Sequence, residues 1–125
     1  MKEIYIGKEK VKEYPFKVTY SIMLQFKTIG IKCKEIVLTS EDVHLNKNLL
    51  KKEPIPKEVK YLDDNCFRNN EDFEVITIHE NIEEIGEYCF KNCDCSIINK
   101  SNHKIEIEKT PKPDILTFSF NNDDD

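Results

Sequence analysis

Two segments of this chain align without a gap at an offset of 23 residues (78 − 55): IPKEVKYLDDNCFRNN at positions 55–70 and IHENIEEIGEYCFKNC at positions 78–93. The dipeptide Cys-Phe occurs in both copies, at 66–67 and at 89–90. Three further equivalent pairs are apolar: Ile55/Ile78, Val59/Ile82 and Leu62/Ile85. The chain therefore contains an internal repeat. Its recurring apolar positions predict a core in which one copy stacks on the next, with Phe67 and Phe90 buried and in contact.

The length of the repeat indicates the fold class. A period of about 20 to 29 residues, with one strand and one turn-rich return per copy, is typical of leucine-rich-repeat solenoids. We predict an α/β repeat that is mostly β, a short leucine-rich-repeat-like solenoid with an N-terminal helical cap and a C-terminal β cap. The 125 residues are expected to form a single domain. Its predicted parts are a capping segment with an irregular connection (1–54), two repeats (55–100), and a C-terminal cap with an acidic tail (101–125).

A helix is predicted over residues 21–29, before the repeats begin. Thr19 or Ser21 can cap its first turn, and Gly30 suits the position after its last turn, where φ is positive. Its expected apolar face consists of Ile22, Phe26 and Ile29. This helix is expected to seal the N-terminal end of the core, with residues 1–14 as an extended arm outside the array.

Three solenoid strands are predicted. Residues 33–39 and 73–79 share the same spacing of apolar positions, and we interpret them as equivalent strands. The apolar positions are Cys33, Ile36 and Leu38 in the first strand and Phe73, Ile76 and Ile78 in the second. A third strand over residues 95–99 fits if the register slips by one residue after the second repeat. Residues 40–54, rich in Lys and Asn, are expected to form an irregular connection.

Composition argues against several classes of protein. The net charge is −5, from 24 acidic and 19 basic residues, so the chain repels phosphate backbones and nucleic acid is not an expected partner. No apolar signal-peptide core and no run of about 18 uncharged apolar residues is present, so we expect no membrane span and a cytoplasmic location by default. The five cysteines are an odd number and are expected to remain thiols.

The repeated residues follow one pattern in both copies. The first copy has Ile55-Pro56, Val59, Leu62 and Cys66-Phe67; the second has Ile82, Ile85-Gly86, Cys89-Phe90 and Cys93. This pattern closely resembles the BspA-like leucine-rich repeats of some protists and bacteria, over roughly residues 14–100. His79 and Asn70 depart from the usual proline and second cysteine, so the chain looks like a short, degenerate member. The resemblance implies a protein-binding role without catalytic residues, and it allows association with the cell surface.

Three groups of residues are candidates for sites of chemistry. Cys66 and Cys89 are equivalent and could lie about 4.7–4.9 Å apart, but recurrence once per repeat is explained by packing in the core. Cys89, Cys93 and Cys95 lack the paired spacing of a zinc knuckle, and we expect Cys93 and Cys95 to be the partly exposed thiols. The three histidines stand in unrelated contexts: His44, His79 and His103. We therefore predict no catalytic residue, no metal site and no cofactor.

The surface that the strands present is the predicted binding site. In a solenoid, the outward positions of successive strands form a continuous sheet face. The predicted protein-binding residues are Val37, Thr39, Glu74, Val75, Thr77, His79, Ile97 and Asn99. Val37, Val75 and Ile97 are expected to form an apolar stripe flanked by charge, as in small protein-binding patches. The alternative is that these residues only satisfy β-propensity.

Two alternative functions, of different classes, remain open besides protein binding. Because repeat proteins usually need at least about three repeats for stability, an open end of the array could pair with a second copy, which predicts a self-associating structural module. A small metalloprotein or enzyme is the least favoured hypothesis. The expected partner is a protein, with self-association as an open alternative.

Overall fold

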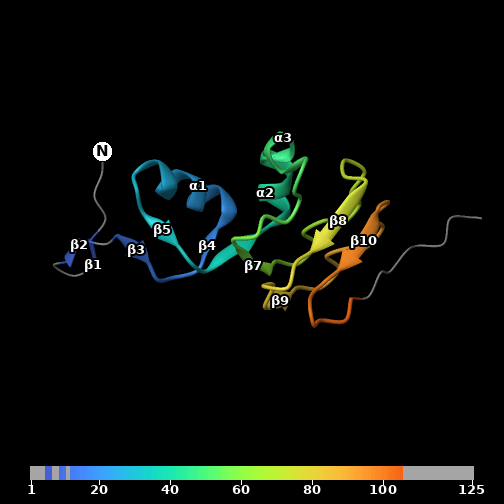
Figure 1. The fold of residues 1–125 in the computed structure, drawn as a ribbon. Coiled ribbons are helices and arrows are strands. Elements are labelled where there is room, and N and C mark those ends of the chain that lie inside the picture. The colour runs from blue at the N-terminus through green and yellow to red at the C-terminus, as the bar shows by residue number, and fades with distance from the viewer. Residues whose placement is uncertain (1–4, 7–8, 11, 106–125) are drawn as a thin grey trace, which may run out of the picture.

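The computed structural model describes residues 5–6, 9–10 and 12–105 (Figure 1). The predicted C-terminal β cap falls mostly on residues 106–125, outside the described residues. Before the repeats, the elements are β1 (Tyr5–Ile6), β2 (Glu9–Lys10), β3 (Glu13–Tyr14), β4 (Val18–Thr19), α1 (Tyr20–Thr28), β5 (Lys32–Cys33), β6 (Ile36–Leu38), α2 (Ser40–Leu45) and α3 (Lys47–Leu50). The repeats contribute β7 (Val59–Leu62), β8 (Val75–Ile78), β9 (Glu84–Ile85) and β10 (Ser96–Asn99).

The fold is mixed α/β with short strands that are mostly parallel. A four-stranded sheet has the order β4-β6-β7-β9, and every neighbouring pair in it is parallel. β8 and β10 form a separate parallel pair, as do β3 and β5, while β1 and β2 are antiparallel. In Figure 1, α2 and α3 lie above β7, and β9 lies below it.

The internal repeat is present in the structure at the offset seen in the sequence. In β7 and β9, Tyr61 pairs with Glu84 and Leu62 pairs with Ile85, so the paired residues are equivalent positions of the two copies. Each copy therefore gives one strand to the four-stranded sheet and one to the β8–β10 pair. Between these strands the two turns are joined along the backbone, since the Phe67 N–H donates to the Cys89 carbonyl at 2.8 Å.

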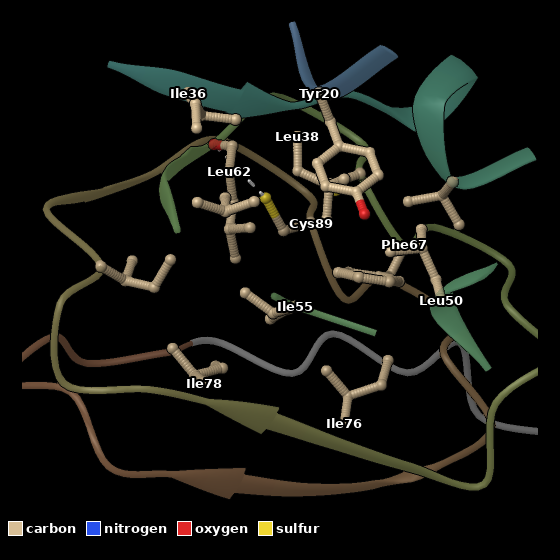
Figure 2. Packing of buried hydrophobic residues seen from close by; sticks show 14 of the residues in the cluster. Tyr20, Ile36, Leu38, Leu50, Ile55, Leu62, Phe67, Ile76, Ile78 and Cys89 are labelled. Carbon is tan, nitrogen blue, oxygen red and sulfur yellow. Dashed lines mark hydrogen bonds between the residues drawn. The ribbon is translucent and has the colours of Figure 1, made fainter. Parts of the chain in front are cut away.

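The core lies between the four-stranded sheet and the β8–β10 pair. Phe67 and Phe90 are each 1% exposed, and their rings stack with centroids 5.8 Å apart and planes 8° apart. This confirms the prediction that both rings are buried and touch across adjacent repeats. Figure 2 shows Ile76 and Ile78 rising from β8 toward Ile55, which is buried in the centre of the cluster.

The predicted helix is confirmed as α1. The Thr19 hydroxyl accepts from the Ile22 N–H. At the other end, the N–H groups of Gly30 and Ile31 donate to carbonyls of the last turn, with Gly30 at φ +78° as a Schellman motif requires. The predicted apolar face is wrong in part, because Ile22 is 42% exposed. The buried residues are Tyr20 and Met23, since β4 leads directly into α1 and places the first helical residue against the core.

The prediction of an irregular connection over residues 40–54 is wrong, because most of this segment is helical. Thr39 and Asp42 form a capping box: the Asp42 N–H donates to the Thr39 hydroxyl, and the Thr39 N–H donates to the Asp42 carboxylate. This satisfies two backbone donors that a helix start leaves without partners. Thr and Asp three residues apart are a helix-start pattern, hidden here because Thr39 directly follows the apolar residues of a strand.

The proposed equivalence of residues 33–39 and 73–79 is also wrong. The first segment includes the end of β5 and the whole of β6, and these two strands belong to different sheets. β6 pairs with β7 through Ile36↔Val59 and Leu38↔Leu62, so it precedes β7 in the four-stranded sheet and does not lie beside β8. Similar apolar spacing reflects burial of alternate residues in both strands, and burial alone does not specify the neighbouring strand.

Candidate functional site

A groove runs along the edge of β8, and three of the predicted binding residues line it: Val75, Thr77 and His79. Its volume is about 470 Å³. The facing wall is the segment between α3 and β7. That wall and the groove's end consist of Lys52, Glu53, Pro54, Ile55, Lys57, Glu80 and Lys100. We call this the β8 groove.

The outward face of β8 is set by the alternation of its side chains. Val75 is 48% exposed, while the next residue, Ile76, is fully buried in the core. Thr77 is half-buried and Ile78 is buried again. The predicted orientation of this strand is therefore confirmed, with Val75 and Thr77 outward and Ile76 and Ile78 inward.

His79 joins the two walls at the C-terminal end of β8. Its Nδ1 accepts from the Asn81 N–H at 3.2 Å, so the ring proton is on Nε2, which donates to the Pro56 carbonyl at 2.9 Å. The bond joins positions that are one repeat apart in the sequence (79 − 56). The imidazole thus fixes the spacing between the strand and the facing segment.

The lining of the β8 groove carries an excess of positive charge. Three of its residues are lysines and two are glutamates. Within the described part of the chain, none of the lysines Lys52, Lys57 and Lys100 forms an ion pair. These ammonium groups can therefore bind anionic side chains without breaking an internal salt bridge.

Val37 and Thr39 do not join this site. They line a second, more open groove of about 400 Å³ on the four-stranded sheet, beside Tyr61 and Asp64. The Thr39 hydroxyl is engaged in the capping box of α2. The predicted continuous strand face is thus divided between two sheets, because β6 and β8 are not neighbours.

A charge network crosses the four-stranded sheet near the second groove. The Tyr61 hydroxyl and the Lys60 ammonium both donate to the Glu35 carboxylate, Lys60 at 3.1 Å. The Tyr61 hydrogen bond, followed by that of Lys60, lowers the pKa of Glu35 below its ordinary value. The same Glu35 contact, with desolvation second, raises the pKa of Tyr61 to about 12. This network links β7 to the residue that precedes β6.

The prediction for β10 is wrong by one residue. Ile97 pairs with Ile76 and packs against the core, while Ile98 is the residue that is 47% exposed. The offset from β8 to β10 (97 − 76) is smaller than the offset from β7 to β9 (84 − 61), because the second repeat has the shorter turn. Ile97 is therefore not part of an outward apolar stripe.

The two remaining predicted residues are exposed but lie outside the groove lining. Glu74 precedes β8, and its carbonyl accepts from the Ser96 N–H. The Asn99 side chain is held in a turn, where its amide donates to the His103 carbonyl and its oxygen accepts from Ser101. Asn99 therefore has a structural role at the end of β10.

The cysteines do not converge on a metal site. Cys66 is buried, and burial raises its pKa far above the ordinary value; burial also raises the pKa of Cys89 to about 11. Cys93 and Cys95 bring their sulfurs within 2.6 Å, and Cys93 is buried, which corrects the expectation that it is partly exposed. Among the described residues, no group of three or more His, Cys, Asp or Glu side chains could hold a metal ion.

The residues that the sequence analysis missed are the lysines and Pro54 of the facing wall. Alignment of one more copy upstream would have placed residues 52–55 opposite β8, with Pro54 at the position of Thr77. Proline cannot donate to a strand ladder and is avoided in central strands. Pro54 in the sequence thus indicates that residues 52–55 do not form a strand paired with β8.

A comparison with family models supports the repeat assignment. A model described as a BspA type leucine-rich repeat region (6 copies) matches residues 39–111, which is more than half of the chain. The chain belongs to the BspA-type leucine-rich repeat family. The matched residues include both copies of the repeat, the two turns and the whole β8 groove. Leucine-rich repeat regions generally bind proteins, and the β8 groove lies inside this region.

Other comparisons give no relative of known function. Neither a curated protein nor a solved structure matches the chain. None of the helices in the described part of the chain has the length and apolar character needed to cross a membrane.

Proposed function

We propose that this BspA-type repeat chain is a non-catalytic protein-binding module and that it binds its partner at the β8 groove. The repeats form a short solenoid in this proposal, with α1 as the N-terminal cap. The observation that carries the proposal is the exposure of Val75 on one wall of a groove whose two walls His79 holds at a fixed spacing. An apolar side chain surrounded by charged residues is the composition expected at the centre of a small binding patch.

Two substitutions on adjacent residues test this site. Val75→Glu should leave the fold intact and reduce capture of the partner about tenfold or more, because the charge is placed on an outward position that the partner covers. Ile76→Glu should unfold the chain, because its side chain is fully buried and the carboxylate would lie in the core. Fold is measured by circular dichroism and partner capture by affinity purification followed by mass spectrometry.

Ile98→Glu is the matched control, since Ile98 is as exposed as Val75 but does not line the groove. It should remain folded and keep the captured partner. If Val75→Glu retained the same partner as the wild type, the β8 groove would not be the binding site.

A further inference from the structure

We infer that the β8 groove binds an extended segment of the partner by strand addition, with acidic side chains of that segment against the lysines. This inference rests on the proposed function and specifies how the partner is held. It depends on the direction of backbone groups along β8, on the lack of a strand at its second edge in the described part of the chain, and on the charge of the groove.

One edge of β8 is already used. The Glu74 carbonyl accepts from the Ser96 N–H at 2.9 Å, and the Ile78 carbonyl accepts from the Lys100 N–H at 2.8 Å. Both carbonyls therefore point toward β10. In a parallel ladder the peptide groups of alternate residues point to opposite edges. The N–H and C=O groups of Val75 and Thr77 consequently point away from β10, into the groove.

Those groups on the second edge have no partner among the described residues. Among the described residues, none forms a backbone hydrogen bond with Val75 or Thr77. The strand that pairs with β8 in this part of the chain is β10. In a regular array, residues 52–55 would supply the preceding strand at this edge. They do not form a strand, and Pro54 occupies the position that would pair with β8.

The free edge is ready to accept a short strand. Val75 and Thr77 together offer two donors and two acceptors, enough to hold about three or four residues of a parallel or antiparallel peptide. The His79–Pro56 bond keeps the facing segment at a fixed distance, so the groove is formed before binding. Preorganisation of this kind lowers the entropy cost of binding an extended peptide.

The charge of the groove selects the peptide. Lys52, Lys57 and Lys100 line it without ion pairs to the described residues, against Glu53 and Glu80. The groove is thus locally positive on a chain whose net charge is −5. Acidic residues that flank a central apolar residue would contact the lysines and Val75 together.

The test uses the full chain and a capped synthetic peptide that alternates glutamate and valine. Binding should slow the amide hydrogen exchange of Val75 and Thr77 about tenfold or more, measured by NMR, with little change at Ile76, which already pairs with β10. The same peptide with alternate backbone nitrogens methylated keeps its charge but loses donors, and it should bind at least about tenfold more weakly. A lysine–valine peptide should not bind.

A variant of the protein removes the backbone donor that β8 would offer to the peptide. Thr77→Pro deletes an N–H that points into the groove and leaves the β10 ladder intact, so the chain should fold and lose the peptide. Thr77→Val keeps the N–H and should bind as the wild type does. If Thr77→Pro did not fold, the methylated peptide alone would decide the result.

Three outcomes would overturn strand addition: slow exchange of Val75 and Thr77 in the protein alone, equal binding of the methylated peptide, or no binding of the acidic peptide. The proposed function fails separately. If Val75→Glu released the native partner while the acidic peptide left the edge unprotected, the groove would remain the binding site without strand addition. If Val75→Glu retained the partner, the proposed function itself would be wrong.

Discussion

Left-handed backbone conformations occur at the same two places in each repeat. Asn65 and Tyr88 have φ values of 61° and 58°, and Asn69 and Asn92 have values of 60° and 55°. Both pairs occupy equivalent positions of the two copies (88 − 65; 92 − 69), so the turn has the same shape in each. Three of the four positions are asparagine, which tolerates this conformation because its short polar side chain can hydrogen-bond locally. Tyr88 is the exception.

Replacement of Tyr88 should therefore show how much asparagine stabilises this left-handed position. We expect Tyr88→Asn to be about 1 kcal/mol more stable than Tyr88→Ala, because both lose the ring but only asparagine suits positive φ. The alanine variant also controls for the loss of the Lys91 ammonium contact, 4.8 Å from the Tyr88 ring centre. Urea unfolding of the two variants measures the difference, and equal stabilities would contradict the explanation.

The two glycines that the structure describes, Gly30 and Gly86, are required for different physical reasons. A Cβ at Gly86 would lie 2.6 Å from the Asp64 backbone nitrogen, so the glycine allows the turns of adjacent repeats to approach closely. Gly30 has no atom within 4 Å of such a Cβ, but its φ is +78°. One position is restricted by space and the other by backbone conformation.

Asparagine substitutions separate these two restrictions. Gly30→Asn should cost less than about 1 kcal/mol, because asparagine adopts positive φ readily. Gly86→Asn should cost about 1–3 kcal/mol or more, because its Cβ would overlap backbone atoms that cannot move aside. Thermal unfolding of both variants gives the comparison; a larger loss at Gly30 would show that the close contact between the repeats is not the constraint.

At the scale of elements, the stacked rings of Phe67 and Phe90 join the two repeats. Truncation of either ring to alanine should cost about 3–5 kcal/mol, through lost transfer energy and the cavity left behind. The double variant should cost less than the sum of the two, because each ring contacts the other. Ile98→Ala, at an exposed position of the same repeats, should have a small effect. Denaturant unfolding that changed little in both phenylalanine variants would disprove the stacking.

At the scale of the whole molecule, Cys66 and Cys89 report on unfolding of the two repeats. Both thiols are buried, and burial raises their pKa values, so neither forms the reactive thiolate at neutral pH. We expect no alkylation of either in the native protein and labelling of both at the same urea concentration, since shared core contacts make the repeats unfold together. Mass spectrometry of the two peptides measures this. Labelling of Cys89 at a clearly lower urea concentration would show that the second repeat unfolds independently.

The hydrogen-bond network of Glu35, Lys60 and Tyr61 contributes to the stability of the whole molecule, and this contribution depends on pH. Contact with Tyr61 and Lys60 lowers the pKa of Glu35 from its ordinary 4.5, so this contribution is present above that pH and is lost as the pH falls through the lowered value. The pKa of Tyr61 is raised from 10.0 to about 12, so its contribution is complete below pH 10 and is lost as the pH rises toward 12.

The sequence by itself determined the repeat and the residues that fill its core. Apolar residues that recur at a constant offset can be buried together in one way, by stacking the copies, so Phe67, Phe90, Cys66 and Cys89 could be assigned in advance. The two ends of α1 could also be predicted, because the signals for them are local: Thr19 and Gly30 act on the adjacent backbone. The outward position of Val75 followed from its neighbours in the same strand.

Only the tertiary structure decided which strands are neighbours and where the groove lies. The alternation of β6 resembles that of β8, yet β6 pairs with β7, and the shorter second turn moves β10 to a smaller sequence offset from β8. These outcomes depend on contacts between distant segments, and a one-residue shift exchanges the two faces of a strand, as it does for Ile97 and Ile98. The β8 groove arises because residues 52–55 lie beside β8 without pairing to it, a relation that exists only when both segments pack on the same core.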